Sequence, residues 1–237
     1  MALRISLIHP SRNRPEQAAE TAKHWLSNMF SVLNLADYVL SIDNSDKTVN
    51  QYKEHFMDGF TIVESDNNNV VEAANNGAKQ AKGDILVLVS DDFECYPDWD
   101  IDLINHYTEH KNNVLKTNDG LQEWIVTLPI MDREYYNSCG YIYYPEYKHM
   151  FADTEMTHKA ELEGKLYKRM DLLFKHNHYT QGETKKDEVN DKANATWEHG
   201  EKIYLERVKN CFGILNVNYL DITDTNAILW LRNKLEK

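Results

Sequence analysis

The feature that most constrains the fold of this chain is an apolar run that ends in two acids. Residues 85–89 read Ile-Leu-Val-Leu-Val, and three of these five side chains are β-branched. Such a run is typical of a strand buried on both faces. After Ser90 come Asp91 and Asp92. Ligands of open α/β sheets bind beyond the carboxyl ends of strands, so adjacent carboxylates there favour a hard divalent cation with a phosphate ligand. An acidic turn or helix cap is the simpler interpretation.

A regular alternation of strands and helices surrounds this run. Expected strands lie at residues 5–9, 38–42, 60–63 and 85–89, and expected helices at 15–33, 70–82 and 97–110. This order is typical of a mostly parallel sheet covered by helices. No Gly-x-Gly-x-x-Gly follows the first strand, and the chain has no Gly-Lys-Ser/Thr loop. Their absence argues against dinucleotide-binding and P-loop folds.

The second half of the chain is less regular. Its expected strands cover residues 122–130, 165–174 and 214–222, and a short helix from Asp132 is ended by Gly140. A charged tail at residues 186–209 and an apolar-periodic segment at 225–235 predict two further helical regions.

Composition narrows the class of protein. The chain has 237 residues and a formal net charge of −12, which disfavours broad attachment to nucleic acid or to an anionic membrane. No apolar run approaches the ~20 residues of a membrane span, and the N-terminus lacks a signal-peptide pattern. The 3 cysteines are scattered and fit a reducing compartment. These features predict a cytoplasmic protein with no membrane span.

The stretch 67–92 resembles the nucleotide-binding half of GT-A glycosyltransferases of family 2. Their pattern is Asn-x-Gly, Ala-Arg-Asn-x-Gly, Ala-x-Gly, a strand and Asp-x-Asp, and the spacing is kept here without a gap. The matching residues are Asn67, Asn69, Ala73, Ala74, Asn75, Gly77, Ala81, Gly83 and Asp92. Asn69 stands at a glycine position, which asparagine tolerates. Ser90 replaces the first Asp, which puts one expected contact to the ribose in doubt.

The resemblance implies a nucleotide-sugar site made by the first loops. Residues 10–15 resemble the family's opening motif, which meets the nucleobase and ribose, so Pro10 and Arg12 are candidates. Asp43 takes the position that accepts a hydrogen bond from the base, and a carboxylate suits the N3–H of uracil, which favours a UDP-sugar. Asn75 and Asp91 complete the set expected to contact the donor. Without the resemblance, Arg12 reads as a surface cation and Asp43 as an Asx-turn residue.

The resemblance also implies a metal ion and a general base. Asp92 is the expected ligand of Mn²⁺ or Mg²⁺. Many GT-A enzymes add a late histidine, for which His178 is the first candidate and His176 the second, although two polar strand-end histidines are an equally simple interpretation. Residues 151–164 resemble the family's Glu-Asp-x-Asp-Leu-x-x-Arg segment, with Ala152 in place of the first acid. Asp153 takes the position of the catalytic base, or else caps the helix that follows.

The implied fold is GT-A, a mostly parallel central sheet flanked by helices with a C-terminal helical extension. Residues 1–110 would form the donor half, 111–185 the acceptor and catalytic half, and 186–237 an extension packed on the core. Within 141–147, tyrosines would stack on the acceptor or serve only in packing. The implied activity is inverting, metal-dependent transfer of a hexosyl or pentosyl group from a UDP-sugar to a glycan or small molecule. Two alternatives stay open: a non-catalytic nucleotide-sugar or glycan-binding module, and a transferase acting on modified nucleic-acid bases.

Overall fold

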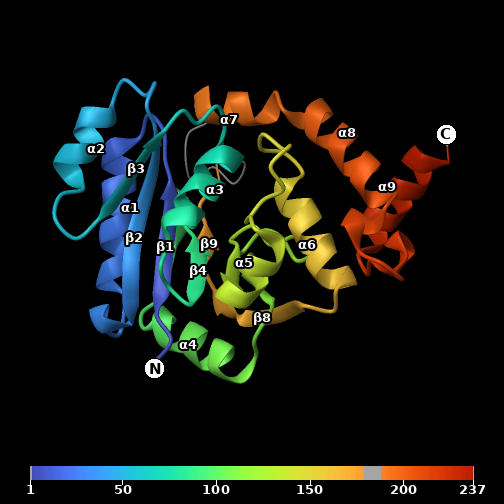
Figure 1. Cartoon of the computed structure of the whole chain (residues 1–237), viewed down its shortest axis with the longest axis horizontal. Coiled ribbons are helices and arrows are strands. Elements are labelled where there is room, and N and C mark those ends of the chain that lie inside the picture. The colour runs from blue at the N-terminus through green and yellow to red at the C-terminus, as the bar shows by residue number, and fades with distance from the viewer. Residues whose placement is uncertain (1, 179–187, 237) are drawn as a thin grey trace.

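The chain folds around one large twisted sheet. The computed structural model describes residues 2–178 and 188–236, and in these the sheet has seven strands in the order β3-β2-β1-β4-β7-β6-β8 (Figure 1). The strands are β1 (Ile5–Pro10), β2 (Leu35–Asp43), β3 (Thr61–Ser65), β4 (Ile85–Leu88), β6 (Val114–Asn118), β7 (Ile130–Asp132) and β8 (Leu166–Leu173). Only β7 runs antiparallel to its neighbours β4 and β6 among these described strands, and the other pairs are parallel. The mostly parallel α/β fold is therefore confirmed.

Helices cover both faces of this sheet. On one face lie α1 (Pro15–Ser27), α2 (Val49–His55) and α4 (Trp99–Glu109), and on the other α3 (Val70–Gln80), α5 (Arg133–Cys139) and α6 (Ala152–Leu162) (Figure 1). Neighbouring strand residues point to opposite faces, so Leu7 packs into the core under α1 while Ile8 packs into the core under α3. This two-sided burial explains why β4 is apolar at every position.

Two glycines allow close packing beside the sheet. A Cβ on Gly83 would lie 2.5 Å from the backbone nitrogen of Ser6. A Cβ on Gly77, inside α3, would lie 2.8 Å from the Ile8 side chain. Glycine at these two positions lets α3 and the chain after it lie directly against β1.

The first helix is shorter than the sequence predicts. It was expected to run to residue 33, but α1 ends at Ser27, and a separate 3₁₀ turn, η1 (Val32–Asn34), follows. The buried carboxylate of Asp100 accepts hydrogen bonds from the backbone nitrogens of Phe30 and Ser31. Because this tertiary contact holds the backbone between the two elements, it overrides the helical periodicity.

The strand expected at residues 122–130 is wrong in all but its last residue. Only β7, Ile130–Asp132, is extended there, and residues 119–129 form a loop. The buried Asp119 carboxylate accepts hydrogen bonds from the backbone of Leu121 and Gln122 and from the Thr127 hydroxyl. These bonds use backbone donors that a strand would need for its ladder.

The short helix predicted after Asp132 is confirmed as α5. Asp132 accepts a hydrogen bond from the Tyr135 backbone at 2.9 Å and so caps the helix, which Gly140 ends with a φ of 78°.

The C-terminal region contains α7 (Glu188–Asn194), α8 (Trp197–Val208), the 3₁₀ turns η3 (Cys211–Gly213) and η4 (Tyr219–Asp221), and α9 (Thr225–Leu235). Of these, α8 and α9 lie beside α6 on the side away from the sheet (Figure 1). The prediction of α9 is confirmed at both ends. The strand expected at 214–222 is wrong, because Asn218 and Asp221 form a capping box that folds those residues into η4. Within the described ranges, no helix has the length and apolarity needed to cross a bilayer.

Candidate active site

The carboxyl ends of β1, β2 and β4 meet at one edge of the sheet, as parallel pairing requires. Pro10 ends β1 and pairs with Ser41 of β2, which brings the loop after β1 next to Asp43. The Arg12 guanidinium contacts the Asp43 carboxylate directly and lies 3.2 Å from the Ser45 hydroxyl. The other Asp43 oxygen accepts a 2.7 Å hydrogen bond from the Ser45 backbone. The structure therefore brings Pro10, Arg12 and Asp43 together, as the sequence predicts.

Asp91 turns inward beneath this loop. One of its oxygens lies 2.8 Å from His9 Nε2, and the Ser11 hydroxyl lies 3.0 Å from the other. The Tyr38 hydroxyl, 2.6 Å from His9 Nδ1, holds the imidazole from behind. Burial, and then the charge of Asp91, raise the pKa of Tyr38. Asp91 thus fixes the loop after β1 through His9 and Ser11, two contacts that spacing along the sequence does not reveal.

Asp92 lies at the mouth of the site. The Ser90 hydroxyl donates to Asp92 Oδ1 at 2.6 Å, and His176 Nε2 lies 3.2 Å from Oδ2. Burial acts to raise the pKa of Asp92, but the hydrogen bond and charge of His176, with smaller effects from Ser90 and Arg14, outweigh it and leave that pKa below its ordinary value. Asp92 is therefore an ionised carboxylate oriented by Ser90, the residue that departs from the family pattern.

A small second sheet brings His176 next to Asp92. In it β5 (Phe93–Glu94) pairs with β9 (Lys175–His176), which sets Phe93 opposite His176. Their rings stack at 4.2 Å, and the ring of His178 lies 5.1 Å from that of His176. Of the two candidate metal ligands, His176 contacts Asp92 directly, and His178 lies against the ring of His176.

Asn75 links α3 to the tyrosine-rich segment. Its side-chain nitrogen donates to the Tyr143 carbonyl at 2.7 Å, and its oxygen accepts from the backbone nitrogens of Ile142 and Tyr143 at 3.0 and 3.1 Å. The amide is buried, and its oxygen and nitrogen are both bonded to this backbone. The structure therefore shows Asn75 joining α3 to residues 142–143.

Asp153 lies in the first turn of α6. The N-cap of this helix is Phe151, so Asp153 does not cap it. Its Oδ1 accepts hydrogen bonds from the backbone nitrogen and the hydroxyl of Thr154, at 2.7 and 3.3 Å. Burial raises the pKa of Asp153, against the opposing effects of Thr154 and His149. Both of these hydrogen bonds are made to Oδ1.

His149 lies in the loop before α6 and was not predicted from the sequence. The residue is exposed. Desolvation of its ring lowers its pKa, against the charges of Asp153 and Asp92, which raise it. No periodicity or spacing marks this histidine, because the packing of the preceding loop alone brings it here.

The side chains around Asp92 fit a divalent metal ion. Carboxylate and imidazole groups bind Mn²⁺, and Mg²⁺ is usually held by one or two carboxylates with substrate phosphates. His176 turns Nε2 toward Asp92, and its other nitrogen, Nδ1, is buried and makes no hydrogen bond to any described residue. Across residues 2–178 and 188–236 no group of three acidic, histidine or cysteine side chains forms a ready metal cluster. A donor diphosphate would therefore have to complete the coordination.

Residues 6–172 match the sequence profile of Glycosyl transferase family 2. That range covers well over half of the 237 residues. The chain belongs to glycosyl transferase family 2. The match ends ahead of His176, and the whole C-terminal region from α7 onward lies outside it.

Known relatives agree with this assignment. A glucosyl-dolichyl phosphate glucuronosyltransferase of Haloferax volcanii is 23% identical over 132 residues, covering 54% of this chain and 41% of that protein. A mannosyltransferase of Pyrobaculum calidifontis, solved in complex with GDP-Man and Mn²⁺, superposes with a TM-score of 0.60 at 14% identity over 74% of this chain and 57% of its own. TarS of S. aureus gives a TM-score of 0.61 at 17% identity over 73% and 36%. The two structures share the fold, and this chain spans well under two thirds of each relative.

Proposed function

We propose that this chain transfers a sugar from a nucleotide-sugar to an acceptor hydroxyl with inversion, using Asp153 as general base. The observation that carries the proposal is the geometry around Asp92, which follows β4 at the carboxyl edge of the sheet and is oriented by Ser90 and His176, in a chain of glycosyl transferase family 2. A donor held at Asp92 and an acceptor held at Asp153 are the two parts of the proposed site.

The environment of Asp153 suits proton transfer. Because burial raises the pKa of this carboxyl, its carboxylate is a stronger base than one in water, and a positioned base contributes about 10²–10⁴-fold to rate. Thr154 fixes one oxygen and leaves Oδ2 to accept the acceptor proton. The acceptor oxygen then forms a bond to the anomeric carbon as the bond to the nucleotide diphosphate breaks. Attack from the face opposite the leaving group inverts the configuration.

Asp92, His176 and His178 are the residues that would hold a divalent ion, Mn²⁺ or Mg²⁺. When bound, such an ion supplies Lewis-acid stabilisation of the charge on a leaving phosphate. Ser90 orients Asp92 for this purpose, at 2.6 Å from Oδ1. The replacement of the family's first acid by Ser90 is therefore compatible with an intact ligand at Asp92, which favours the enzyme over the non-catalytic binding module.

Arg12 and Asp43 are proposed to meet the nucleobase and ribose, with a UDP-sugar as the donor. Both oxygens of Asp43 face donors, Arg12 on one side and the Ser45 backbone on the other. A carboxylate so placed accepts from the N3–H of uracil and also from guanine, and the Pyrobaculum relative was solved with GDP-Man. Competition between UDP and GDP at equal concentration distinguishes the two donors.

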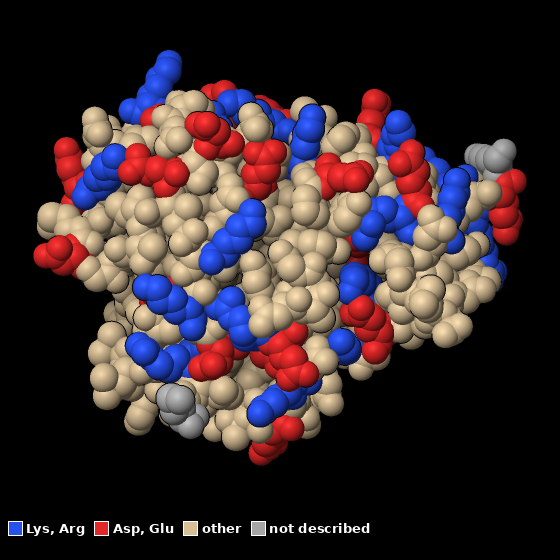
Figure 2. Space-filling view, in the orientation of Figure 1, with Lys and Arg blue, Asp and Glu red and all other residues tan. Residues whose placement is uncertain are grey.

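The acceptor is proposed to be a glycan or small molecule. On the face shown in Figure 2, acidic and basic side chains are interspersed and no broad basic field is present. Together with the net charge of −12, this disfavours nucleic acid as the acceptor. Residues 1–110 are proposed as the donor half, 111–185 as the acceptor half and 186–237 as an extension, in a cytoplasmic protein.

The test of the proposed function is the variant Asp153→Asn, with Asp58→Asn on an exposed turn as the matched control. The assay measures release of nucleotide diphosphate from a panel of UDP-glucose, UDP-GlcNAc and GDP-mannose with Mn²⁺, with water or added glycans as acceptor. We expect Asp153→Asn to lose about 10²–10⁴-fold in turnover with unchanged nucleotide affinity. Wild-type turnover in Asp153→Asn would remove Asp153 as the base.

A further inference from the structure

The loop that leads to Asp153 is held by α8, which lies outside the family match. His199 Nε2 lies 3.0 Å from the Glu146 carbonyl, and the Thr196 hydroxyl accepts from the Met150 backbone nitrogen at 3.1 Å. Both contacts satisfy backbone groups of residues 144–151, an irregular segment that leads into α6. The start of α8 therefore supplies hydrogen bonds to backbone groups of this loop.

Phe151 is held in an unusual conformation by the same region. It is the N-cap of α6 and has a φ of 71°, a left-handed value that is rare for a bulky residue and costs free energy. Its ring packs against Trp197 and Tyr204 of α8 at 5.0 and 5.7 Å, and against Trp230 of α9 at 5.8 Å. This aromatic packing offsets the backbone strain and sets the direction in which α6, and Asp153 with it, begins.

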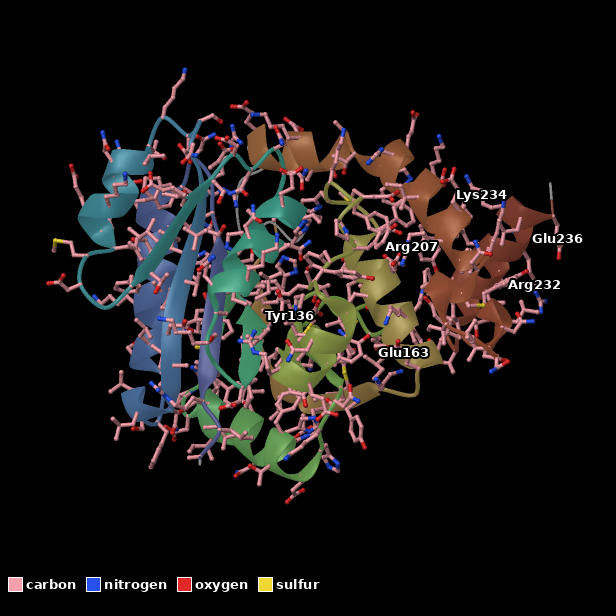
Figure 3. All side chains as sticks on the ribbon, viewed as in Figure 1. Tyr136, Glu163, Arg207, Arg232, Lys234 and Glu236 are labelled. Atoms are coloured by element: carbon pink, nitrogen blue, oxygen red, sulfur yellow. The ribbon has the colours of Figure 1, made fainter. Side chains whose placement is uncertain are left out.

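Arg207 extends the contact further along α6. Its Nε lies 2.7 Å from both oxygens of Glu155, which is 2% exposed and also accepts from the Tyr147 hydroxyl at 2.8 Å. The guanidinium carbon lies 3.3 Å from the centre of the Tyr144 ring. One side chain of α8 thus contacts the start of the loop at Tyr144 and the first turn of α6 at Glu155. Figure 3 shows Arg207 on the side of α8 that faces α6.

Gly200 brings α8 into direct backbone contact with this loop. A Cβ at this position would lie 2.2 Å from the Met150 carbonyl oxygen. Alanine is favoured over glycine inside a helix, so the glycine here is explained by the space that the loop occupies.

We propose that α8 is the positioning element of the acceptor side, and that Arg207 and Gly200 are its positioning residues, holding residues 144–153 so that Asp153 meets the acceptor. The proposal rests on the proposed function for the role of Asp153. None of these contacts of α8 is made to Arg12, Asp43 or Asp92, so we expect substitutions in α8 to act first on the acceptor side.

The first experiment measures backbone hydrogen exchange in the full chain, and does not depend on activity. The variants are Arg207→Lys, which keeps the charge but loses the two-pronged contact and the planar stacking, and Gly200→Ala. Lys234→Met is the control, because it breaks a 2.8 Å ion pair with Glu201 between α9 and α8 without touching the loop (Figure 3). We expect faster exchange at residues 144–155 in both variants, unchanged exchange in β1 to β4, and no change in the control. Wild-type exchange at 144–155 in both variants overturns the proposal.

The second experiment separates kcat from KM, with UDP-glucose or GDP-mannose as donor, Mn²⁺, and water as acceptor. A misplacement of about 1 Å at a reacting group costs about 10²-fold in rate, so kcat should fall by about that factor in both variants while the KM for the donor stays constant. If kcat and donor affinity fall by the same factor, or if neither falls, the positioning role of α8 is contradicted. If the wild type releases no nucleotide from any donor, the proposed function fails, and the exchange data still decide whether α8 holds the loop.

Discussion

Replacing Arg207 by methionine should weaken the whole fold, because it leaves the charge of Glu155 buried with one remaining donor, Tyr147. Glu155 is 2% exposed at its side chain and Arg207 20%. Breaking a buried pair by removing one partner costs about 3–5 kcal/mol. The partial exposure of Arg207 places this variant near the lower end, at about 3 kcal/mol. In a chain of 237 residues that loss corresponds to a fall in Tm of roughly 6–12 °C.

Urea unfolding followed by circular dichroism measures this loss, with Lys234→Met as the control. The Lys234–Glu201 pair is 41% and 22% exposed at its side chains, and such surface pairs contribute about 0–1 kcal/mol. The double variant Glu155→Gln with Arg207→Met should recover part of the stability, because no unpaired charge then remains buried. A loss below about 1 kcal/mol in Arg207→Met, equal to that of the control, would refute this reasoning.

Two further predictions concern metal binding and pH. Ser90→Ala removes the 2.6 Å hydrogen bond that orients Asp92, so Mn²⁺ affinity in the presence of UDP, measured by calorimetry, should fall about 10–100-fold. The control Ser90→Asp restores the family's acid and should bind Mn²⁺ at least as well as the wild type. Wild-type affinity in Ser90→Ala would contradict the orienting role of Ser90. Burial lowers the pKa of His158, whose Nδ1 lies 2.6 Å from the Tyr204 hydroxyl. Between that lowered pKa and about 6.5, the pKa of an unperturbed histidine, the unfolded chain therefore binds more protons than the folded chain. The contribution of neutral His158 to the free energy of unfolding should be complete above about pH 6.5 and be lost as the pH falls below it. Urea unfolding at several pH values should show that His158→Gln loses less stability in acid than the wild type does.

The sequence predicts best those elements whose burial is complete and uninterrupted. The run at 85–89 predicts β4 because helices cover both faces of the sheet, and the helix at 225–235 is bounded by an Asp224 cap that its sequence makes visible. β6 was not predicted, since Lys116 interrupts its apolar pattern. That lysine is nevertheless buried, and its ammonium group donates to the Gln122 carbonyl at 2.6 Å.

Sequence order brings together the residues proposed for the donor side more readily than those proposed for the acceptor side. Arg12, Asp43 and Asp92 follow strand ends, so topology alone brings them together. His149 and Arg207 come together with Asp153 and Glu155 only when α8 packs on the loop before α6. Contacts of this kind join residues about fifty positions apart and leave no periodic trace in the sequence. The roles of all these residues in donor binding, metal binding and catalysis, including those of Asp92, Asp153 and His178, stay predictions.

A nucleotide-sugar site at Asp92 can be tested by calorimetric titration of UDP and of GDP, with and without Mn²⁺, into the wild type and into Asp92→Asn. Asn keeps the shape of the side chain and removes the charge beside Ser90 and His176. We predict that one nucleotide binds in a Mn²⁺-dependent manner and that affinity falls at least about tenfold, or ~1.4 kcal/mol, in the variant. Binding of neither nucleotide, or binding that is indifferent to both Mn²⁺ and Asp92, would contradict a nucleotide-sugar site at this edge of the sheet.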